Sequence, residues 1–256
     1  MISERRDGRC AGLRSPSISS VTASPLLPMA HSAHRSASHL CHHLSTGYCS
    51  PMPESKARRP AHRPSRRFQL IEAAVELFAV KPVDLVTIAE IVRQAGMTPA
   101  AFYYHFPSRE DLLQEFVTQF AEDWTHQAER LWSDAQSADD VLAVVQRLLD
   151  WANEHRMKAS VYFVNSRGAS VAVEEIRQNA TSRTSAAAAA AICRATGREP
   201  GASTSLEGLS LVTVIESALR AELSLDAAYR TLGPQHFRDE VHEQCARVIN
   251  VLYRVA

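Results

Sequence analysis

Two helix start signals on either side of a glycine constrain this chain more than any other feature. Thr87 stands three residues before Glu90, the spacing of a capping box, in which each side chain accepts a hydrogen bond from the other residue's backbone amide. Gly96 can take the left-handed conformation that ends a helix, and Thr98 with Pro99 suits the N-cap and first position of the next helix. The pattern predicts two short helices joined by a tight turn, a helix-turn-helix.

The sequence on both sides of this motif is also helical. A first helix starts at Arg66 and is ended by Pro82, the third helix is expected over 99–105, and a fourth opens at Ser108. Residues 66–118 should therefore form a three-helix head, whose third helix is suited to the major groove of DNA. The apolar faces comprise Ile71, Ala74, Val75 and Phe78 in the first helix, Ile88, Ile91, Val92 and Ala95 in the second, and Leu112, Phe116, Phe120, Trp124 and Leu131 in the fourth.

The region 119–256 is expected to be helical throughout, which makes the predicted fold all-α. Five further helices are expected over 138–155, 157–166, 171–196, 204–224 and 235–255. Two of them carry apolar stripes, Leu209, Val212, Ile215 and Leu219 in one and Phe237, Val241, Cys245, Val248 and Leu252 in the other. These stripes either pair with a second copy of the chain as a four-helix interface or face their own core, and the sequence does not decide between the two.

Charge is divided unevenly along the chain. The 28 basic and 28 acidic residues give a formal net charge of zero, which excludes binding to nucleic acid by bulk charge alone. Residues 1–65 carry nine basic and three acidic side chains, whereas residues 66–256 carry 19 and 25. The basic residues between 56 and 67, just ahead of the first helix, are expected to form an arm that reaches phosphates or the minor groove.

The N-terminal 65 residues differ in composition from the rest. They hold seven of the twelve Pro residues and no periodic apolar face, so we expect a disordered tail. The tail lacks the apolar core of a secretory signal, and Met29 or Met52 is an alternative start. Its Cys and His residues lack the paired spacing of a zinc site, so no metal site is expected. No apolar run in the chain is long enough to predict a membrane span.

Motifs within residues 67–118 match the pattern of a known family. They include an Ala-x-x-Leu-Phe helix end, a second helix opened by Thr, and Tyr-x-His-Phe at the end of the third helix. The matching residues are Ala74, Leu77, Phe78, Thr87, Ile91, Ala95, Gly96, Tyr103, His105, Phe106, Ser108, Glu110 and Leu112. On these residues the head resembles the tetracycline-repressor (TetR) family of bacterial transcription regulators. It departs at Pro82, Phe102 and Arg109, where the family usually has Gly, Leu and Lys.

The resemblance implies a sequence-specific transcription regulator, a homodimer that binds a near-palindromic operator in double-stranded DNA and is released by a small-molecule effector. It implies that Tyr103 and His105 contact the DNA backbone, that Arg109 binds a phosphate, and that Thr87 caps the second helix near a phosphate. Such contacts position a protein, whereas contacts to base edges specify sequence. The residues expected to face the groove are Thr98, Pro99, Ala100, Ala101 and Tyr104.

The C-terminal helices are expected to hold an effector pocket, for which Trp151, Tyr162, Phe163 and Asn165 combine aromatic surface with a polar group; ordinary core is the alternative for each. No cofactor is expected, and the chain lacks the common nucleophile, phosphate-loop and zinc-protease motifs. We therefore expect a cytoplasmic regulator rather than an enzyme. The alternative is a helical dimeric ligand-binding or interaction protein with a degenerate head, since residues 66–118 carry five basic and seven acidic side chains.

Overall fold

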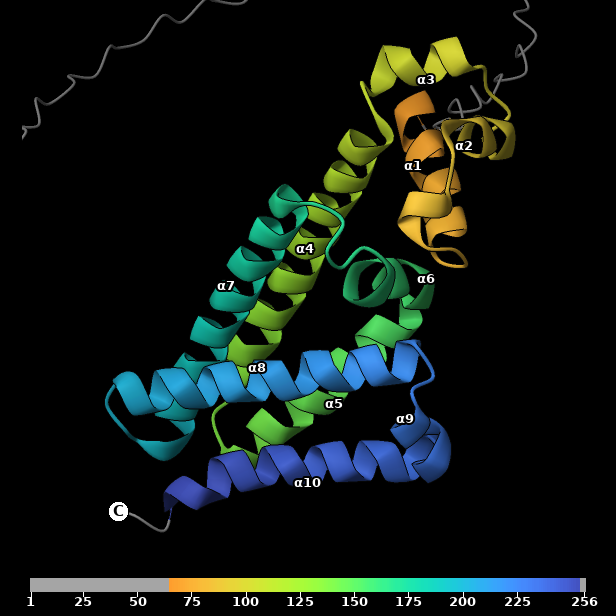
Figure 1. Ribbon diagram of the computed structural model, residues 1–256. Helices are drawn as coiled ribbons and strands as arrows, with labels where there is room; N and C mark the ends of the chain where they lie inside the picture. The colour runs from red at the N-terminus through yellow and green to blue at the C-terminus, as the bar shows by residue number, and fades with distance from the viewer. Residues whose placement is uncertain (1–64, 254–256) are drawn as a thin grey trace, which may run out of the picture. The chain divides into compact units, whose positions relative to one another are not determined.

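The computed structural model describes residues 65–253, with side chains through residue 249, and forms ten α-helices in this part of the chain (Figure 1). The helices are α1 (Arg66–Phe78), α2 (Ile88–Gln94), α3 (Pro99–His105), α4 (Arg109–Asp134), α5 (Ala138–Glu154), α6 (Arg156–Ser160), α7 (Val171–Thr196), α8 (Ala202–Leu223), α9 (Ala227–Leu232) and α10 (Pro234–Tyr253). A 3-10 turn spans Val83–Leu85 and a π-helical turn spans Val161–Asn165. The described residues contain no strand, so the expected all-α fold is confirmed. None of these helices is long and apolar enough to cross a lipid bilayer.

Several expectations concern residues outside the described part of the chain. The tail over 1–64, its Cys and His residues, the alternative starts at Met29 and Met52, and most of the basic arm lie there. The two arm residues that are described, Arg66 and Arg67, belong to the first turn of α1.

The helix-turn-helix forms as its start signals predict. Thr87 Oγ1 accepts a hydrogen bond from the Glu90 amide at 3.2 Å, and the Glu90 carboxylate accepts one from the Thr87 amide at 3.0 Å. Thr98 caps α3 in the same way at 3.2 Å, and Gly96 turns the chain with φ of +66°. The Lys81 ammonium and the Thr87 donors hold the pKa of Glu90 at about 2, so the capping carboxylate is ionised at neutral pH.

Aromatic packing around α3 holds the head together. Phe102 and Phe106 are buried, with ring centroids 5.8 Å apart, and belong to one core cluster with apolar residues of α1, α2 and α4. Arg67 of α1 lies over the Phe106 ring at 4.3 Å and donates to the His105 carbonyl at 2.6 Å. It also pairs with Glu115 of α4. One side chain thereby ties α1 to both α3 and α4.

The C-terminal helices are organised around α7, which packs along α4 and α8 (Figure 1). The two helices approach closely at Gly208 of α8, where a Cβ would lie 2.4 Å from the Ser185 carbonyl oxygen and 2.9 Å from Ala189 Cβ. Ala189 belongs to a run of six alanines, residues 186–191. Small residues on both helices therefore let the two backbones approach.

Two stretches differ from the sequence-based expectation. The helix expected over 157–166 is α6 followed by the π-helical turn, because the Val161 carbonyl accepts from the Ser166 amide at 3.0 Å and from its hydroxyl at 2.7 Å. A bond to the fifth preceding residue widens the helix. The short helix α9, capped by Asp226, follows α8 where none was expected. The domain boundary at 118 stays a prediction, and residue 118 lies within α4, as the expected fourth helix already implied.

The apolar stripes of α8 and α10 face this protein's own core for most of their length. The buried members are Val212, Ile215 and Leu219 on α8 and Phe237, Val241 and Cys245 on α10. Leu252 lies beyond the described side chains, whereas Leu209 is 43% exposed, one turn from Leu206 at 63%. The sequence left open whether the stripes face a second copy of the chain or their own core. For these six residues, the structure shows burial in the core of the same chain.

Gly208→Ala tests the contact between α7 and α8. Within a helix, alanine is usually favoured over glycine by about 1 kcal/mol. Here the added Cβ would collide with the α7 backbone, so we expect a net loss of about 1–3 kcal/mol in the free energy of unfolding. Urea denaturation followed by circular dichroism measures this loss. The control Glu175→Ala, at an exposed site on α7, should change stability by less than about 0.5 kcal/mol. A stabilised Gly208→Ala protein would contradict the contact.

Candidate nucleic-acid interface and ligand cavity

The exposed face of α3 presents most of the side chains expected to contact DNA. Successive residues of an α-helix turn by about 100°, so Ala100 and Tyr104 share the centre of this face, with Tyr103 on one side and Ala101 on the other. Tyr104 is 85% exposed and Tyr103 is 58% exposed, whereas Phe102 points into the core. The two tyrosine side chains are therefore available for contacts outside the chain.

One side of α3 borders a hollow of about 290 Å³, which we call the Tyr103 hollow. Thr87, Tyr103, Ser108 and Arg109 all line it. Since α2 begins just after Thr87 and α4 just after Ser108, two helix N-termini open near this hollow. Such termini present backbone N–H groups and the positive end of the helix dipole, which favour an anion. The structure thus brings together three residues that the resemblance assigned to phosphate contacts or to a cap beside one.

The other side of α3 borders a second hollow, which we call the Arg66 hollow. It measures about 690 Å³, and Arg66, Gln69, Thr98 and Ala101 are among the residues that line it. Arg66 is exposed, and its guanidinium forms no ion pair with another described residue. From the sequence, Arg66 was only part of a basic arm and Gln69 was not selected. Their position became informative only when the packing of α1 beside α3 was known.

Arg109 bonds to other groups of the protein. Its Nη1 donates to the carbonyls of Asp84 and Val86 at 3.0 and 2.8 Å, and its Nη2 lies 2.5 Å from Glu110 Oε1. The bond from Arg109 lowers the pKa of the Glu110 carboxyl below its usual value. The guanidinium therefore braces the 3-10 turn against the start of α4, whereas the resemblance implied a phosphate contact. The backbone carbonyls of the turn need donors, and Arg109 supplies them.

Pro99 and His105 stand at the two ends of α3. Pro99 is exposed at the first helical position. His105 is half-buried, its ring stands edge-on to Tyr104 with centroids 5.0 Å apart, and its carbonyl accepts from Arg67. Both residues thus border the exposed face, and His105 is positioned by packing against its neighbours.

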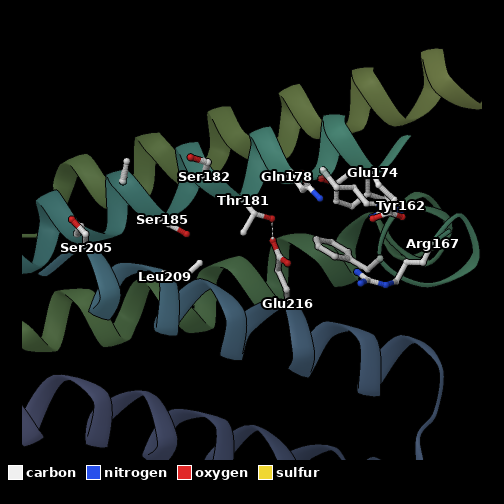
Figure 2. A pocket seen from close by; sticks show the side chains of 14 residues that line it. Tyr162, Arg167, Glu174, Gln178, Thr181, Ser182, Ser185, Ser205, Leu209 and Glu216 are labelled. Atoms are coloured by element: carbon white, nitrogen blue, oxygen red, sulfur yellow. Dashed lines mark hydrogen bonds and ion pairs between the residues drawn. The ribbon is translucent and has the colours of Figure 1, made fainter. Parts of the chain in front are cut away.

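A cavity of about 590 Å³ lies between α7, α8 and the π-helical turn (Figure 2). Tyr162 and Phe163 of the turn line it, together with Arg167, Glu174 and Arg177. The rest of the wall consists mainly of small and hydroxyl side chains, and includes Thr181, Ser185, Ala189, Leu209 and Glu216. Its volume is within the range of small-molecule sites. We refer to it as the α7–α8 cavity.

Burial controls the ionisation of groups on this cavity. Burial raises the pKa of the Tyr162 phenol and of the Glu216 carboxyl, and it lowers the pKa of the Arg177 guanidinium, because the charged forms are disfavoured away from water. Arg177 lies over the Tyr162 ring at 4.5 Å and donates to Ser166 Oγ at 2.6 Å. Thr181 Oγ1 donates to Glu216 at 2.9 Å, the dashed line in Figure 2. The cavity therefore offers a neutral phenol, a guanidinium and a carboxyl to a ligand.

Tyr162 and Phe163 were expected to line a pocket, and the structure places both on the α7–α8 cavity. Trp151 was expected there as well but does not line it. Its ring stacks on His155 with centroids 4.4 Å apart and packs against Trp124 at 5.8 Å. Trp151 therefore belongs to the aromatic packing between α4 and α5, the alternative that the sequence left open.

Asn165 was also expected in the pocket, and it too lies elsewhere. Its Nδ2 donates to the carbonyl of Phe78 at 2.7 Å and to that of Ala79 at 3.3 Å. These carbonyls stand at the end of α1, where helix geometry leaves acceptors without partners in the helix. Asn165 therefore ties the π-helical turn to the head.

Comparison with known proteins agrees with this architecture. Residues 70–116 match the model of the bacterial regulatory proteins of the tetR family. The nucleoid occlusion factor SlmA of Marinobacter nauticus is 38% identical over 61 residues, 24% of this chain and 31% of that protein. The HTH-type transcriptional regulator TtgR of Pseudomonas putida is 34% identical over 83 residues, 32% of this chain and 39% of that protein. The chain thus matches only 31% and 39% of the length of these two relatives.

Similarity to solved structures extends over most of the described residues. The transcriptional regulator FadR of Bacillus subtilis, solved in complex with stearoyl-CoA, superposes with a TM-score of 0.57 at 14% identity, over 71% of this chain and 97% of that chain. At this level of identity the comparison shows a shared fold.

Arg109→Ala should destabilise the head, because it leaves the carbonyls of Asp84 and Val86 without their donor. We expect the free energy of unfolding to fall by about 1–3 kcal/mol, measured by urea denaturation. Arg93→Ala removes an exposed guanidinium from α2 and is the matched control, with an expected change below about 0.5 kcal/mol. If the two variants were equally stable, Arg109 would be free to bind a phosphate, as the resemblance implies.

Proposed function

Since the chain belongs to the TetR family of bacterial regulatory proteins, we propose that it is a DNA-binding transcription regulator, a repressor that a small molecule releases. It acts in the cytoplasm as a homodimer on a near-palindromic operator in double-stranded DNA. The observation that carries this proposal is the exposed face of α3 between the Tyr103 hollow and the Arg66 hollow.

The chemistry of α3 suits the major groove. The groove of B-DNA is about 12 Å wide and admits one helix. Ala100 and Ala101 are small enough to let the backbone approach base edges and to contact thymine methyl groups, while Tyr104 adds a hydroxyl. Phosphates of the two strands would then run past the two hollows, near Arg66 on one side and the starts of α2 and α4 on the other.

A dimer through α8 and α10 would present two copies of α3 to the two half-sites. The outer face of α8 carries the exposed Leu206 and Leu209, and Thr213 and Ser217 continue it toward the end of the helix. Apolar and small side chains on one helix face suit packing against another helix. A twofold axis there matches a near-palindromic operator, with half-sites roughly one helical turn, about 34 Å, or slightly more apart.

Hydrogen bonds at the two ends of the π-helical turn connect it to the α7–α8 cavity and to the head. Arg177 donates to Ser166 Oγ at 2.6 Å, and that hydroxyl donates to the Val161 carbonyl at 2.7 Å. Asn165, at the other end of the π-helical turn, donates to the Phe78 carbonyl at 2.7 Å. A ligand that rearranges this turn would shift α1 and change the spacing of the two α3 helices. It must bind one arrangement more tightly than the other to do so.

Selection of bound DNA from a random pool, with the full chain, tests the proposal. We expect enrichment of a near-palindromic sequence and an affinity that falls steeply with salt, because phosphate contacts release counterions. Tyr104→Ala and substitutions of Ala101 should alter the selected sequence, whereas Tyr103→Ala should weaken binding to all sequences alike. A pool that remains unenriched at low salt would contradict sequence-specific binding.

Arg66→Ala should weaken operator binding and reduce the slope of log affinity against log salt by about one, the amount expected for one phosphate contact. Titration of a labelled operator at several salt concentrations measures both effects. Arg183→Ala is a control of equal charge, because Arg183 is exposed on α7 and pairs with Glu129 at 2.9 Å. If the slope of log affinity against log salt were equal in the two variants, Arg66 would not contact a DNA phosphate.

Asn165→Ala should loosen the end of α1 by removing the donor to the Phe78 and Ala79 carbonyls. We expect faster amide hydrogen exchange in peptides that cover residues 76–86, measured by mass spectrometry, because local opening becomes easier. The control Asn179→Ala removes an exposed amide from α7 and should leave exchange in these peptides unchanged. Unchanged exchange in Asn165→Ala would mean that this side chain does not hold the head.

A second candidate function is a helical dimeric ligand-binding or interaction protein whose head does not bind DNA. The observation that favours it is the charge of the head, where Arg67, Lys81 and Arg109 form ion pairs with acidic neighbours. Few cations then remain for phosphates. The selection experiment separates the two functions, because this protein would enrich no sequence and would show no steep salt dependence.

A further inference from the structure

The α7–α8 cavity contains a buried cation whose hydrogen-bonding capacity is largely unused. Arg177 lines the cavity and is 6% exposed. Its Nη2 donates to Ser166 Oγ, while its Nε makes no hydrogen bond with the described residues and lies 3.5 Å from Glu174 Oε1. A guanidinium has five N–H donors in a fork that matches a carboxylate. Because unmet donors are costly when buried, an acceptor from outside the chain would be strongly favoured here.

The acidic groups at the cavity compensate this cation only in part. The Glu174 carboxylate, which lies near Arg177, also accepts a hydrogen bond from the Gly168 backbone amide at 2.8 Å. Glu216 accepts from Thr181, and burial raises its pKa toward the neutral form. Arg167 lies at the same end of the cavity as Tyr162 and adds a second guanidinium (Figure 2). Positive charge therefore dominates at this end.

Beyond the cation, the cavity extends along small residues of α7 toward Leu209 of α8 (Figure 2). Ala186 and Ala189 form part of this wall. The hydroxyl of Ser185 is buried there and has no hydrogen-bond partner among the described residues. Ser185 follows Arg177 by eight residues, so their α-carbons lie about 12 Å apart along the same side of the helix. The wall thus has a cationic end, a middle stretch that carries the hydroxyl side chains of Thr181 and Ser182, and a far end with the apolar Ala186, Ala189 and Leu209.

We propose that the effector of this cavity is a small carboxylic acid, whose carboxylate binds Arg177 and whose elongated apolar body lies along the small residues of α7 toward Leu209. The proposal rests on the regulatory function proposed above and specifies the chemical class of its effector. The carboxylate would also compete with Ser166 for Arg177 and so weaken the bond that joins this arginine to the π-helical turn.

An amine is the main competing class of effector, because Glu216 and the Tyr162 ring also face the cavity. Two observations weigh against it. The Glu216 carboxyl already accepts from Thr181, whereas the spare groups at Arg177 are donors. An ammonium group would also lie close to Arg177 and Arg167, and like charges repel strongly where water is excluded.

Matched probes on the full chain test the proposal. One set comprises 4-phenylbutanoate, 4-phenylbutanamide and 4-phenylbutylamine, and a second comprises decanoate, decanamide and decylamine. Quenching of tryptophan emission can report binding, since Trp124 packs edge-on against Phe163 of the cavity wall at 5.2 Å. We expect the acid of at least one set to bind roughly 10- to 100-fold more tightly than its amide, from charge-assisted hydrogen bonds, and the amine to bind most weakly.

Arg177→Gln should reduce the affinity for that acid roughly 10-fold or more and leave the affinity for the amide within about threefold. Arg177→Lys keeps the charge without the fork and should restore part of the loss. Arg183→Gln, which removes an exposed guanidinium from the same helix, is the control and should not change acid binding. If Arg177→Gln does not fold, as judged by circular dichroism, the comparison of acid, amide and amine on the unaltered chain decides alone.

Equal affinity for acid and amide, preference for the amine, or no binding by either acid up to about 1 mM would overturn the proposal. Operator binding by the same preparation separates this failure from failure of the proposed function. A chain that binds its selected operator but prefers amines is a regulator with another class of effector. A chain that binds acids through Arg177 but enriches no DNA supports the ligand class and contradicts the regulatory function.

Discussion

The π-helical turn Val161–Asn165 is held by two bonds to one carbonyl, and both halves of the protein meet at it. The amide and the hydroxyl of Ser166 both donate to Val161, which widens the helix. This geometry points Tyr162 and Phe163 toward the α7–α8 cavity, while Asn165 reaches the end of α1. Because close-packed interiors shift between discrete arrangements rather than deform smoothly, we expect a change at one side of the turn to displace the groups on the other side.

The packing of α7 against α8 creates the cavity and limits its shape. Gly208 lets the helices approach at Ser185 and Ala189, two of the small side chains on the cavity wall. Two polar groups on this wall, Arg177 Nε and Ser185 Oγ, have no hydrogen-bond partner among the described residues. Buried polar groups are normally satisfied, and these unpaired groups are consistent with the proposal that a ligand binds at Arg177.

In the head, most of the basic side chains stabilise the fold. Arg67 joins α1 to α3 and α4, and Arg109 supports the 3-10 turn. The groups left to meet phosphates are the exposed Arg66 and Arg93 and the N-termini of α2 and α4. Positioning on DNA would therefore depend on a few directed donors, which is consistent with the acidic balance of residues 66–118.

The sequence by itself determined the elements whose partners are local. The capping box of Thr87 and Glu90, the turn at Gly96 and the bounds of α3 all follow from contacts within a few residues. Only the tertiary structure decided the role of Asn165, because its acceptors lie 87 and 86 residues away in the sequence. The same holds for Arg177, which the sequence does not distinguish from any other arginine on a helix. Helix periodicity identifies an apolar face but not the surface that covers it, and burial by distant elements gave these two side chains their chemistry.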